Sequence, residues 1–564
     1  MRLFAFLTLN PELRRATCAA LKRAGTFSAL HTPPGSKWLV AFTPDSPESD
    51  RSGAYFLEGA SELAAVSTAE LLNRCRYGQL QPLPGDFTFA CFGAQAEAFF
   101  VRSAAGAAPL FLWQNESSVA VASRLGDLLR FIPEEPRLDL LGNAVLCGFA
   151  AAPPDGRTPF EGVRLLENGA VTAVSGTLRC RTAAWWCPPV AERPRPGRVR
   201  EHADELHRLL VASLRAGTSS DGASLFAVSG GLDSSTLAWL ASATLGRRFS
   251  TLTLVPERPA NVATMRAQTQ ALFTELGTAV TRRFEFATAP EARLDYLAQT
   301  HPEAAYVGHP ALCLLERVSR EHPVRFYVGG EFCDQVLGGG PVAQDFAFSS
   351  SAFDLLFRRP HYLRGARGIR SVVTTRVRRM LGRALTYMSS QPPPSFLSRE
   401  ATLEYVEAAR DEAENLARDR RPRAALAYQI RLAQPTLVQN WEVSSRLGIR
   451  RVFPFFNRAA LDLAYRTHPL DMADVRNKSL LLAAMRPTIP PALLDRPKYA
   501  WREGAANLPW TDRIPAELGG IVRADWLESP PQQLSPLDAL RLRATLNIIT
   551  AVRTIRLARR ESTR

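Results

Sequence analysis

The chain has 564 residues, 46% of them hydrophobic, and a formal net charge of +15. This composition excludes a disordered protein, and no apolar run approaches the roughly 20 residues that a membrane span needs. The charge is compatible with nucleic acid or an acidic partner, but only four of the 69 basic residues are lysines, so broad use of arginine accounts for most of it.

The N-terminus and the cysteines favour a reduced compartment. The first ten residues, MRLFAFLTLN, contain a short apolar run without a small-residue cleavage site, which disfavours a signal peptide. The eight cysteines are scattered and form no CxxC pair, which disfavours a zinc knuckle and a disulfide framework. We therefore expect a cytoplasmic protein.

Residues 1–186 are predicted to form a β-rich domain. Short apolar or alternating runs, among them KWLVAF, GDFTFACFG and SVAVAS, are separated by glycine, proline and serine. This pattern is typical of strands joined by turns. The stretch 187–200 is rich in proline and arginine and is predicted to be a linker between domains.

Residues 201–564 are predicted to form a second domain. After an amphipathic helix at 201–216, the apolar strands SLFAVS, FSTLTLV, TRRFEF and VRFYVGG alternate with helices. This alternation predicts an α/β domain, with a parallel sheet covered by helices on both faces. From about residue 341 the pattern becomes mostly helical, with arginine-rich pieces at 358–383 and 417–423.

The loop SGGLDSS, between the strand SLFAVS and the next helix, predicts a phosphate site. Two glycines, Gly230 and Gly231, allow backbone N–H groups to approach a ligand, and the helix start adds further donors. The hydroxyls available there are those of Ser229, Ser234 and Ser235. A Walker A spacing is absent. Because phosphate would repel Asp233 unless a cation lies between them, we expect magnesium there. The alternative is a glycine turn with a serine N-cap.

The stretch VRFYVGGEFCDQVLGGG, residues 324–340, ends a second strand in glycines, Gly329 and Gly330. Ligands of an open parallel sheet bind beyond the carboxyl ends of its strands. Asp334 is therefore a candidate for a second metal ligand, and Glu331 is a candidate base. The alternative is that both acids cap the next helix.

Two of the four lysines fall in one C-terminal stretch. Lys478 begins the predicted helix KSLLLAAM, where a lysine opposes the helix dipole unless an anion lies nearby. Lys498 follows a proline on a predicted loop. Both are candidate functional residues because lysine is scarce here and arginine does not replace a compact point charge. The alternative is two solvated lysines.

Together these segments resemble the asparagine synthetase family of ATP pyrophosphatases. SGGLDSS resembles the pyrophosphate loop of the family, and VGGEFCDQVLGGG its SGEGADELFGGY segment. RVFPFFN, NKSLLLAAM and RPKYAW resemble its RVPFLD, KYLLREA and R.K.GF segments, and LPGDFTFACFG and AGAAPLFLW fall in the order of its glutaminase domain. The resemblance covers nearly the whole chain. It implies an Ntn-type αββα domain followed by an ATP pyrophosphatase domain of the HUP (PP-loop) kind.

The resemblance also implies roles for residues. ATP would lie with its phosphates on the SGGLDSS loop and near Lys478, and with its adenine along the strand at Thr253 and Leu254. Magnesium would be held by Asp233 and Asp334. Lys498 matches the catalytic lysine of the family, which would offset negative charge that develops during amide formation.

Two departures from the family pattern point away from glutamine chemistry. A glutaminase of this kind needs an N-terminal cysteine as nucleophile, but residue 2 is Arg2 and the first cysteine is Cys18. We therefore expect the N-terminal domain to be a scaffold without glutaminase activity. In GEFCDQ, Phe332 and Cys333 replace small residues of the family, from which we expect a reshaped substrate pocket.

Family members without that cysteine include β-lactam synthetases and lasso peptide cyclases, which are macrolactam synthetases. The long, arginine-rich region 341–425 favours a lasso peptide cyclase. Its expected partners are a precursor peptide, a leader peptidase and a leader-binding protein, and no nucleic acid. The alternatives are a β-lactam synthetase, an ammonia-dependent asparagine synthetase, a tRNA-modifying ATP pyrophosphatase and a non-catalytic binding scaffold. The basic tail RTIRLARRESTR is either a docking arm or a solvated helix end, and we expect the latter.

Overall fold

The fold is described from a computed structural model of the chain. The described residues are 2–33, 36–43, 50–51, 53–58, 63, 65–81, 83, 85–94, 97–135, 137–139, 156–186, 197–255, 259–287, 310–338, 345, 374, 377–378, 381, 384, 393–419, 423–472, 478–494, 508–509, 514–528, 531–534, 538, 542, 546, 553, 556–557 and 559–560.

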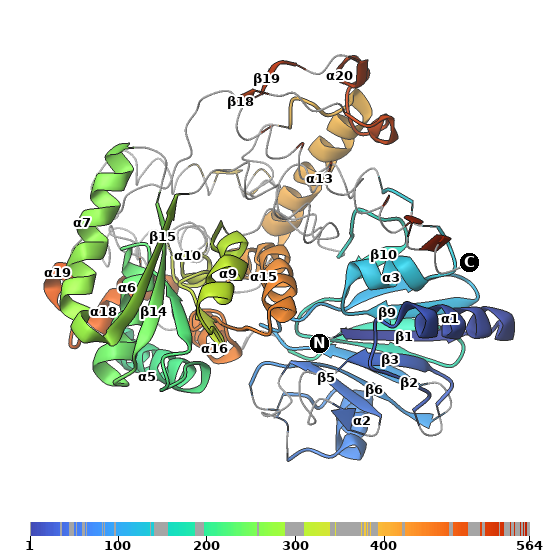
Figure 1. The fold of residues 1–564 in the computed structure, drawn as a ribbon, viewed down its shortest axis with the longest axis horizontal. Helices are drawn as coiled ribbons and strands as arrows, with labels where there is room; N and C mark the ends of the chain where they lie inside the picture. Colours follow the sequence, from blue (N-terminus) through green and yellow to red (C-terminus); the bar gives the residue numbers. More distant parts are fainter. Residues whose placement is uncertain are drawn as a thin grey trace.

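In the N-terminal part, two six-stranded antiparallel sheets face each other (Figure 1). The first sheet has the order β10 (Val163–Leu165), β8 (Phe111–Gln114), β9 (Ser118–Ala122), β1 (Arg2–Thr8), β3 (Leu39–Thr43), β2 (Ala29–His31). The second has the order β12 (Cys180–Ala184), β11 (Ala170–Val174), β7 (Ala98–Arg102), β6 (Thr88–Phe92), β5 (Ala54–Glu58), β4 (Asp50–Arg51).

Alternation along the strands explains this layering. In β1, Leu3 and Ala5 belong to the core between the sheets, whereas Phe4 and Phe6 belong to a core under helices. Helices α1 (Pro11–Ala24) and α3 (Leu125–Phe131) cover the first sheet, and α2 (Thr68–Tyr77) covers the second. The layers therefore run helix, sheet, sheet, helix.

The second part is built on a five-stranded sheet in which every neighbouring pair is parallel, as predicted. Its order is β15 (Val280–Ala287), β14 (Phe249–Val255), β13 (Ser224–Ala227), β16 (Phe326–Val328), β17 (Arg450–Val452). The chain moves outward from β13 to β14 and β15, and then returns to the other side of β13 with β16. This reversal of strand order makes a topological switch point between β13 and β16.

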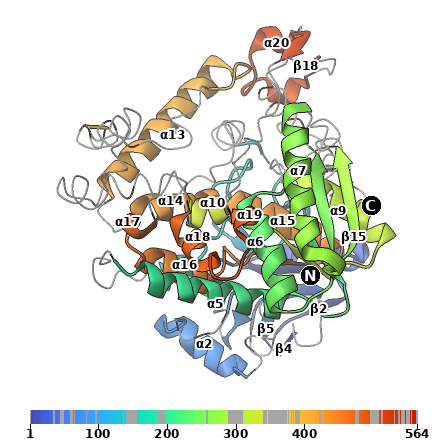
Figure 2. The same cartoon turned by 90° about the vertical axis from the view of Figure 1, so that its left-hand side faces the viewer.

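Helices cover both faces of the parallel sheet. Leu225 of β13 shares a core with Leu315 and Val443, from α9 (Pro310–Glu321) and α15 (Gln434–Arg446). Its neighbour Phe226 belongs to the opposite core, which includes side chains of α5 (Val199–Gly217), α6 (Leu232–Trp239), α7 (Pro259–Leu276) and α18 (Ser479–Met485). Figure 2 shows α5 beside α18 and α16 (Arg458–Arg466). Helix α5 begins inside the predicted linker 187–200, of which residues 187–196 lie outside the described residues.

A further apolar core lies apart from the sheets. Tyr405 and Ala409 of α13 (Arg399–Arg418) pack with Leu518 and Ile521. In Figure 1, α13, α20 (Ala524–Glu528) and the pair β18 (Leu508–Pro509) and β19 (Gln533–Leu534) lie above the other layers. The remaining short elements are η3 (Leu240–Thr244), η4 (Gly277–Ala279), α10 (Cys333–Val336), α14 (Ala424–Leu432), α17 (Pro469–Met472), α19 (Pro491–Leu494) and η8 (Ala516–Leu518). No helix within the described ranges is long and apolar enough to cross a membrane.

The described part of the basic tail is exposed at Arg553, Arg556, Leu557 and Arg560, as expected, but Arg559 is anchored. Arg559 donates hydrogen bonds to four backbone carbonyls at and just beyond the end of α3: those of Leu129 (3.0 Å), Ile132 (2.8 Å), Pro133 (3.1 Å) and Glu134 (2.6 Å). The carbonyls at a helix C-terminus lack intrahelical partners and attract a cation. These hydrogen bonds place Arg559 against α3 of the N-terminal layers, which Figure 1 labels.

Candidate active site

The two loops predicted to carry the chemistry meet at the switch point of the parallel sheet. Strands β13 and β16 are neighbours, with Phe226 opposite Val328, so the loops that follow them begin side by side. Gly330 makes their close approach possible: a Cβ there would lie 3.0 Å from the backbone nitrogen of Ser234 and 3.1 Å from Cβ of Asp233. Gly330 is therefore explained by packing against the first turn of α6, whereas Gly329 lies against the side chain of Glu331.

The SGGLDSS loop folds into a compact turn held by its own hydroxyls. Gly230 has a φ of +77°, a left-handed conformation that favours glycine, and Gly231 is the N-cap of α6. Ser234 Oγ accepts a hydrogen bond from the Ser229 backbone nitrogen at 3.2 Å and lies 3.2 Å from Ser229 Oγ. No side chain caps the start of α6. The loop thus has a glycine N-cap, not the serine N-cap of the alternative interpretation.

A buried lysine joins the two loops. Nζ of Lys478 lies 2.5 Å from Oδ2 of Asp233 and 2.8 Å from Oδ1 of Asp334. Only 8% of the Lys478 side chain is exposed, against 54% for that of Asp334, so the cluster opens to solvent on the Asp334 side. The structure therefore brings together the two carboxylates predicted to hold a metal, with an ammonium group between them.

The charges in this cluster depend on one another. Burial by itself lowers the pKa of Lys478, but the facing Cys333, Asp233 and Asp334 outweigh burial and raise that pKa. Burial raises the pKa of Asp233, and Lys478 opposes this shift. Burial also raises the pKa of the Cys333 thiol well above its usual value. The raised pKa of Lys478 favours its ammonium form, and the raised pKa of Cys333 favours the neutral thiol.

The candidate base Glu331 is held by an arginine that sequence reasoning missed. Arg451, on β17, donates from Nη2 to Oε1 of Glu331 at 2.8 Å, and both side chains are buried. The guanidinium also lies over the ring of Tyr327, 3.9 Å from its centroid. Arg451 stands opposite Tyr327 in the parallel register. The sequence carried no signal for this contact, because it depends on the pairing of strands far apart in the chain.

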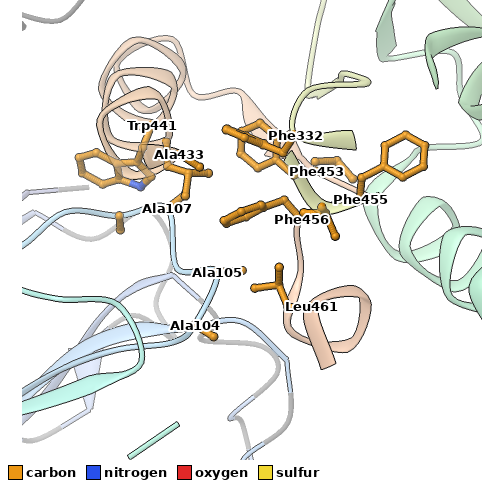
Figure 3. Close-up of a cluster of buried hydrophobic side chains, with 14 of the residues drawn as sticks. Ala104, Ala105, Ala107, Phe332, Ala433, Trp441, Phe453, Phe455, Phe456 and Leu461 are labelled. Atoms are coloured by element: carbon orange, nitrogen blue, oxygen red, sulfur yellow. The ribbon is translucent and has the colours of Figure 1, made fainter. Parts of the chain in front are cut away.

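Phe332, which was expected to reshape the substrate pocket, faces the protein core. Its ring packs against Phe453 (centroids 5.2 Å apart) and Phe456 (4.7 Å), as Figure 3 shows. Phe332 has a φ of +68°, which is strained for a residue with a side chain. This backbone conformation and the aromatic packing set the start of the short helix α10, and so the position of Asp334.

Two further buried hydroxyls lie on the SGGLDSS loop and on the neighbouring strand β14. Val228, just after β13, donates a backbone hydrogen bond to Leu252 of β14. Thr253 and Leu254 therefore follow on β14 next to the point where the SGGLDSS loop begins. Oγ1 of Thr253 and Oγ of Ser235 are both buried and have no hydrogen-bond partner among the described residues. Buried hydroxyls are normally paired, so these two are available to a ligand.

The donor set fits a divalent cation that completes its coordination with ligand and water oxygens. Asp233 Oδ1 is buried and accepts no hydrogen bond from a nitrogen or oxygen atom of the described residues. Magnesium prefers carboxylate oxygens together with phosphate and water. Within the part of the chain that is described, no three His, Cys, Asp or Glu side chains gather into a cage that could hold a metal by itself.

Some predicted residues cannot be placed. Lys498 lies outside the described residues, as does most of the region 341–425 before α13. Within that region, Asp345 is buried and pairs with Arg423, with Oδ2 3.0 Å from Nε. Asp345 also accepts hydrogen bonds from the first backbone nitrogens of α14. This contact anchors the region to α14 and does not test its predicted role.

Comparison with known proteins gives one family. A family model described as asparagine synthase matches residues 205–546, more than half of the chain. No curated protein matches the chain significantly.

Two solved structures were also found. Glutamine phosphoribosylpyrophosphate amidotransferase from B. subtilis, complexed with ADP and GMP, is 9% identical, with a TM-score of 0.23 over 51% of this chain and 82% of that one. A structure described as the allosteric regulatory enzyme of purine biosynthesis is 10% identical, with a TM-score of 0.22 over 51% and 81%. Scores this low support no argument.

Proposed function

The chain belongs to the asparagine synthase family of ATP-dependent, amide-forming enzymes, and from this premise we propose that it is a lasso peptide cyclase. In this proposal it adenylates an Asp or Glu side chain of a precursor peptide. It then closes a macrolactam ring with the N-terminal amine of the same peptide. The amine thus comes from the substrate and not from glutamine.

The start of β1 is the observation that carries the choice of an amine other than that of glutamine. β1 contains no cysteine, and Arg2 at its first position donates from Nη2 to Oδ1 of Asp127 at 3.0 Å. The first cysteine, Cys18, is on α1 and packs toward the core under the helices. The thiol that glutaminase chemistry requires therefore has no place on this strand.

The contact between the two halves supports a scaffold role for the N-terminal layers. The segment after β7 contributes Ala104, Ala105 and Ala107, and the second half contributes Phe456 and Trp441 (Figure 3). All these side chains are buried in one continuous apolar core. Such packing stabilises the position of the segment that supports Phe332, and hence of the loop carrying Asp334.

The helical structure above the sheet supports a substrate larger than a free amino acid. Helix α13 and described residues between 514 and 546 build an apolar core distinct from the cores of the sheets. Such a layer is not needed to hold ATP at the switch point. We assign it to the binding of the peptide.

The reaction has two balanced steps. A carboxylate oxygen of the peptide attacks the α-phosphorus of ATP, the bond to the β-phosphate oxygen breaks, and pyrophosphate leaves. The peptide amine then attacks the acyl carbon, the bond to AMP breaks, and Glu331 accepts the amine proton. Arg451 keeps the Glu331 carboxylate in position for this transfer. Lys498 is assigned to charge stabilisation in this step.

The residues of the switch point divide the binding of ATP and magnesium between them. Asp233 and Asp334 would hold Mg²⁺, which, when bound, neutralises phosphate charge. The SGGLDSS loop and the Ser235 hydroxyl would contact the phosphates, and Thr253 and Leu254 the adenine. Holding both ends of one peptide in place also lowers the entropic part of the barrier to ring closure, by on the order of 7 kcal/mol or more.

The test is release of AMP and pyrophosphate with three substrates in parallel. They are a peptide with a free N-terminus and an internal Asp or Glu, a small carboxyethyl amino acid, and aspartate with ammonia. We expect AMP only with the peptide, and a peptide product lighter by one water in mass spectrometry. AMP release only with the carboxyethyl amino acid would indicate a β-lactam synthetase. AMP release only with aspartate and ammonia would indicate an asparagine synthetase. Peptide binding without AMP release would indicate a non-catalytic scaffold, and retention of RNA at physiological salt would revive a tRNA-modifying enzyme.

A further inference from the structure

Lys478 occupies an unfavourable position in three independent ways. Its side chain is buried, although an ammonium group is strongly hydrated in water. Its backbone is left-handed, with a φ of +70°. It is also the N-cap of α18, where the helix dipole repels a positive charge. Strained conformations of this kind persist where surrounding contacts impose them, and they cluster at functional sites.

The two carboxylates are the described groups that pair directly with the ammonium and offset these costs. Lys478 Nζ lies within 2.8 Å of both Asp233 and Asp334, which come from the two strands that flank the switch point. An ammonium and a divalent cation compete for such a pair, because two carboxylates cannot neutralise both at once. Oδ1 of Asp233 has no nitrogen or oxygen donor among the described residues, so it is open to the incoming ion.

We propose that Lys478 is a resident counter-ion of the metal site, which holds Asp233 and Asp334 together until a divalent cation displaces it. This inference rests on the metal-ligand role of the two aspartates in the proposed function. Once displaced, the ammonium loses its carboxylate partners. The ammonium can then pair with a nucleotide phosphate bound on the neighbouring SGGLDSS loop. Lys478 is therefore a positioning residue that couples arrival of the cation to binding of the phosphates.

The proposal makes a counter-intuitive prediction for nucleotide-free protein. Replacing Lys478 by methionine removes the competing charge, so Lys478→Met is expected to bind Mn²⁺ about tenfold or more tightly than the parent, given the strength of a buried charge at this distance. The measurement is free Mn²⁺ by electron paramagnetic resonance during titration. With ATP present the order should reverse, because the variant lacks the phosphate partner.

Three further variants make the test specific. Lys478→Gly also removes the charge and relieves the left-handed strain, so it serves if the methionine variant folds poorly. Asp334→Asn in the Lys478→Met background should abolish the gain, which locates the ion. Lys22→Met is the matched control, since Lys22 is an exposed lysine on α1, and its Mn²⁺ binding should equal that of the parent.

Two negative results are distinguishable. If Asp233→Asn weakens Mn²⁺ binding in the presence of ATP but both Lys478 variants bind nucleotide-free Mn²⁺ no more tightly than the parent, only the counter-ion role is overturned. If Asp233→Asn and Asp334→Asn both leave Mn²⁺ binding with ATP unchanged, the metal ligands are wrong, and the counter-ion role and the metal site of the proposed function fail together.

Discussion

Two loops that each follow a strand and contain glycine show how the two halves of the molecule differ. The loop 103–108, after β7 in the N-terminal part, is filled from within. Buried Arg102 donates to the carbonyls of Ala108 and Gly106 (both 3.1 Å), and Glu58 Oε2 accepts from the backbone nitrogens of Ala107 (2.8 Å) and Ala108 (3.2 Å). The charged groups there are used to hold backbone.

The loop 229–235, after β13, is organised in the opposite way. Its charges face one another across the switch point, and the buried atoms Asp233 Oδ1 and Ser235 Oγ have no nitrogen or oxygen partner among the described residues. A buried polar group that is paired with backbone stabilises the fold, whereas one left unpaired is costly unless a ligand completes it. The loop 103–108 therefore has a structural role, whereas the loop 229–235 is suited to binding a ligand.

The largest expected effect is a loss of turnover from a substitution in the loop 229–235. Asp233→Asn removes one of the two carboxylates at the switch point, and we expect AMP-forming turnover to fall at least about 10²–10³-fold, as when an electrostatic group of an active site is lost. The measurement is pyrophosphate release under saturating ATP. The control is Asp221→Asn. Asp221 is an exposed aspartate before β13 that pairs with Arg325, and this variant should retain parental turnover. Parental pyrophosphate release by Asp233→Asn would remove this loop from the active site.

The next largest effect is a loss of stability from a substitution that removes the support of the loop 103–108. Arg102→Met leaves the carbonyls of loop 103–108 and the Glu58 carboxylate without their buried cation. We expect a loss of about 3–5 kcal/mol in the free energy of unfolding, the usual result of removing one partner of a buried charge network. Arg74→Met, which removes an exposed pair with Glu70 on α2, should cost less than about 1 kcal/mol. Denaturant titration measures both, and equal losses would show that loop 103–108 is not a structural anchor.

The parallel sheet could be predicted from the sequence, because buried strands and helices alternate with clear boundaries. FSTLTLV was predicted to be a strand, and it forms β14 over its whole length, residues 249–255. The convergence of Asp233 with Asp334 followed from the rule that both strand ends meet at one edge. These features depend on local pattern and on general topology.

Contacts set by long-range register could not be predicted. The Arg451–Glu331 pair exists because β17 lies beside β16, and no spacing in the sequence encodes that neighbour. Likewise, the inward direction of the Phe332 side chain depends on a left-handed φ that its sequence context does not favour. The hydrogen bond from Arg559 to the end of α3 also joins residues more than 400 positions apart.

A pH dependence sharpens the scaffold side of the comparison. Asp86 accepts from Ser103 Oγ and from the backbone nitrogen of Arg458 at the start of α16, and burial, with Glu58 nearby, raises its pKa to about 7. Because the folded pKa lies above the unfolded value, the native state holds the proton more tightly, and stability falls as pH rises from about 4 to 7. The slope cannot exceed about 1.4 kcal/mol per pH unit.

Asp86→Asn removes this titration. We therefore expect its free energy of unfolding, relative to the parent, to improve steadily between pH 5 and about 7 and to level off above that. Denaturant titrations at five or six pH values give the difference directly. A difference that is flat across this window would mean that Asp86 is ionised in the folded protein throughout, and that its contact with α16 is an ordinary charged cap.

The smallest effect separates the two loops most sharply, because it removes a single hydroxyl. Ser235 Oγ is buried without a partner among the described residues, so Ser235→Ala should leave the free energy of unfolding within about 0.5 kcal/mol of the parent, or raise it slightly. It should weaken ATP binding by several-fold, the worth of about one hydrogen bond. Ser224→Ala is the matched control, because buried Ser224 Oγ accepts from the Ser219 backbone nitrogen at 3.0 Å. That variant should lose about 1–2 kcal/mol of stability and keep its ATP affinity. If instead Ser235→Ala is the destabilised variant and binds ATP normally, the hydroxyl serves the fold and the phosphates lie elsewhere.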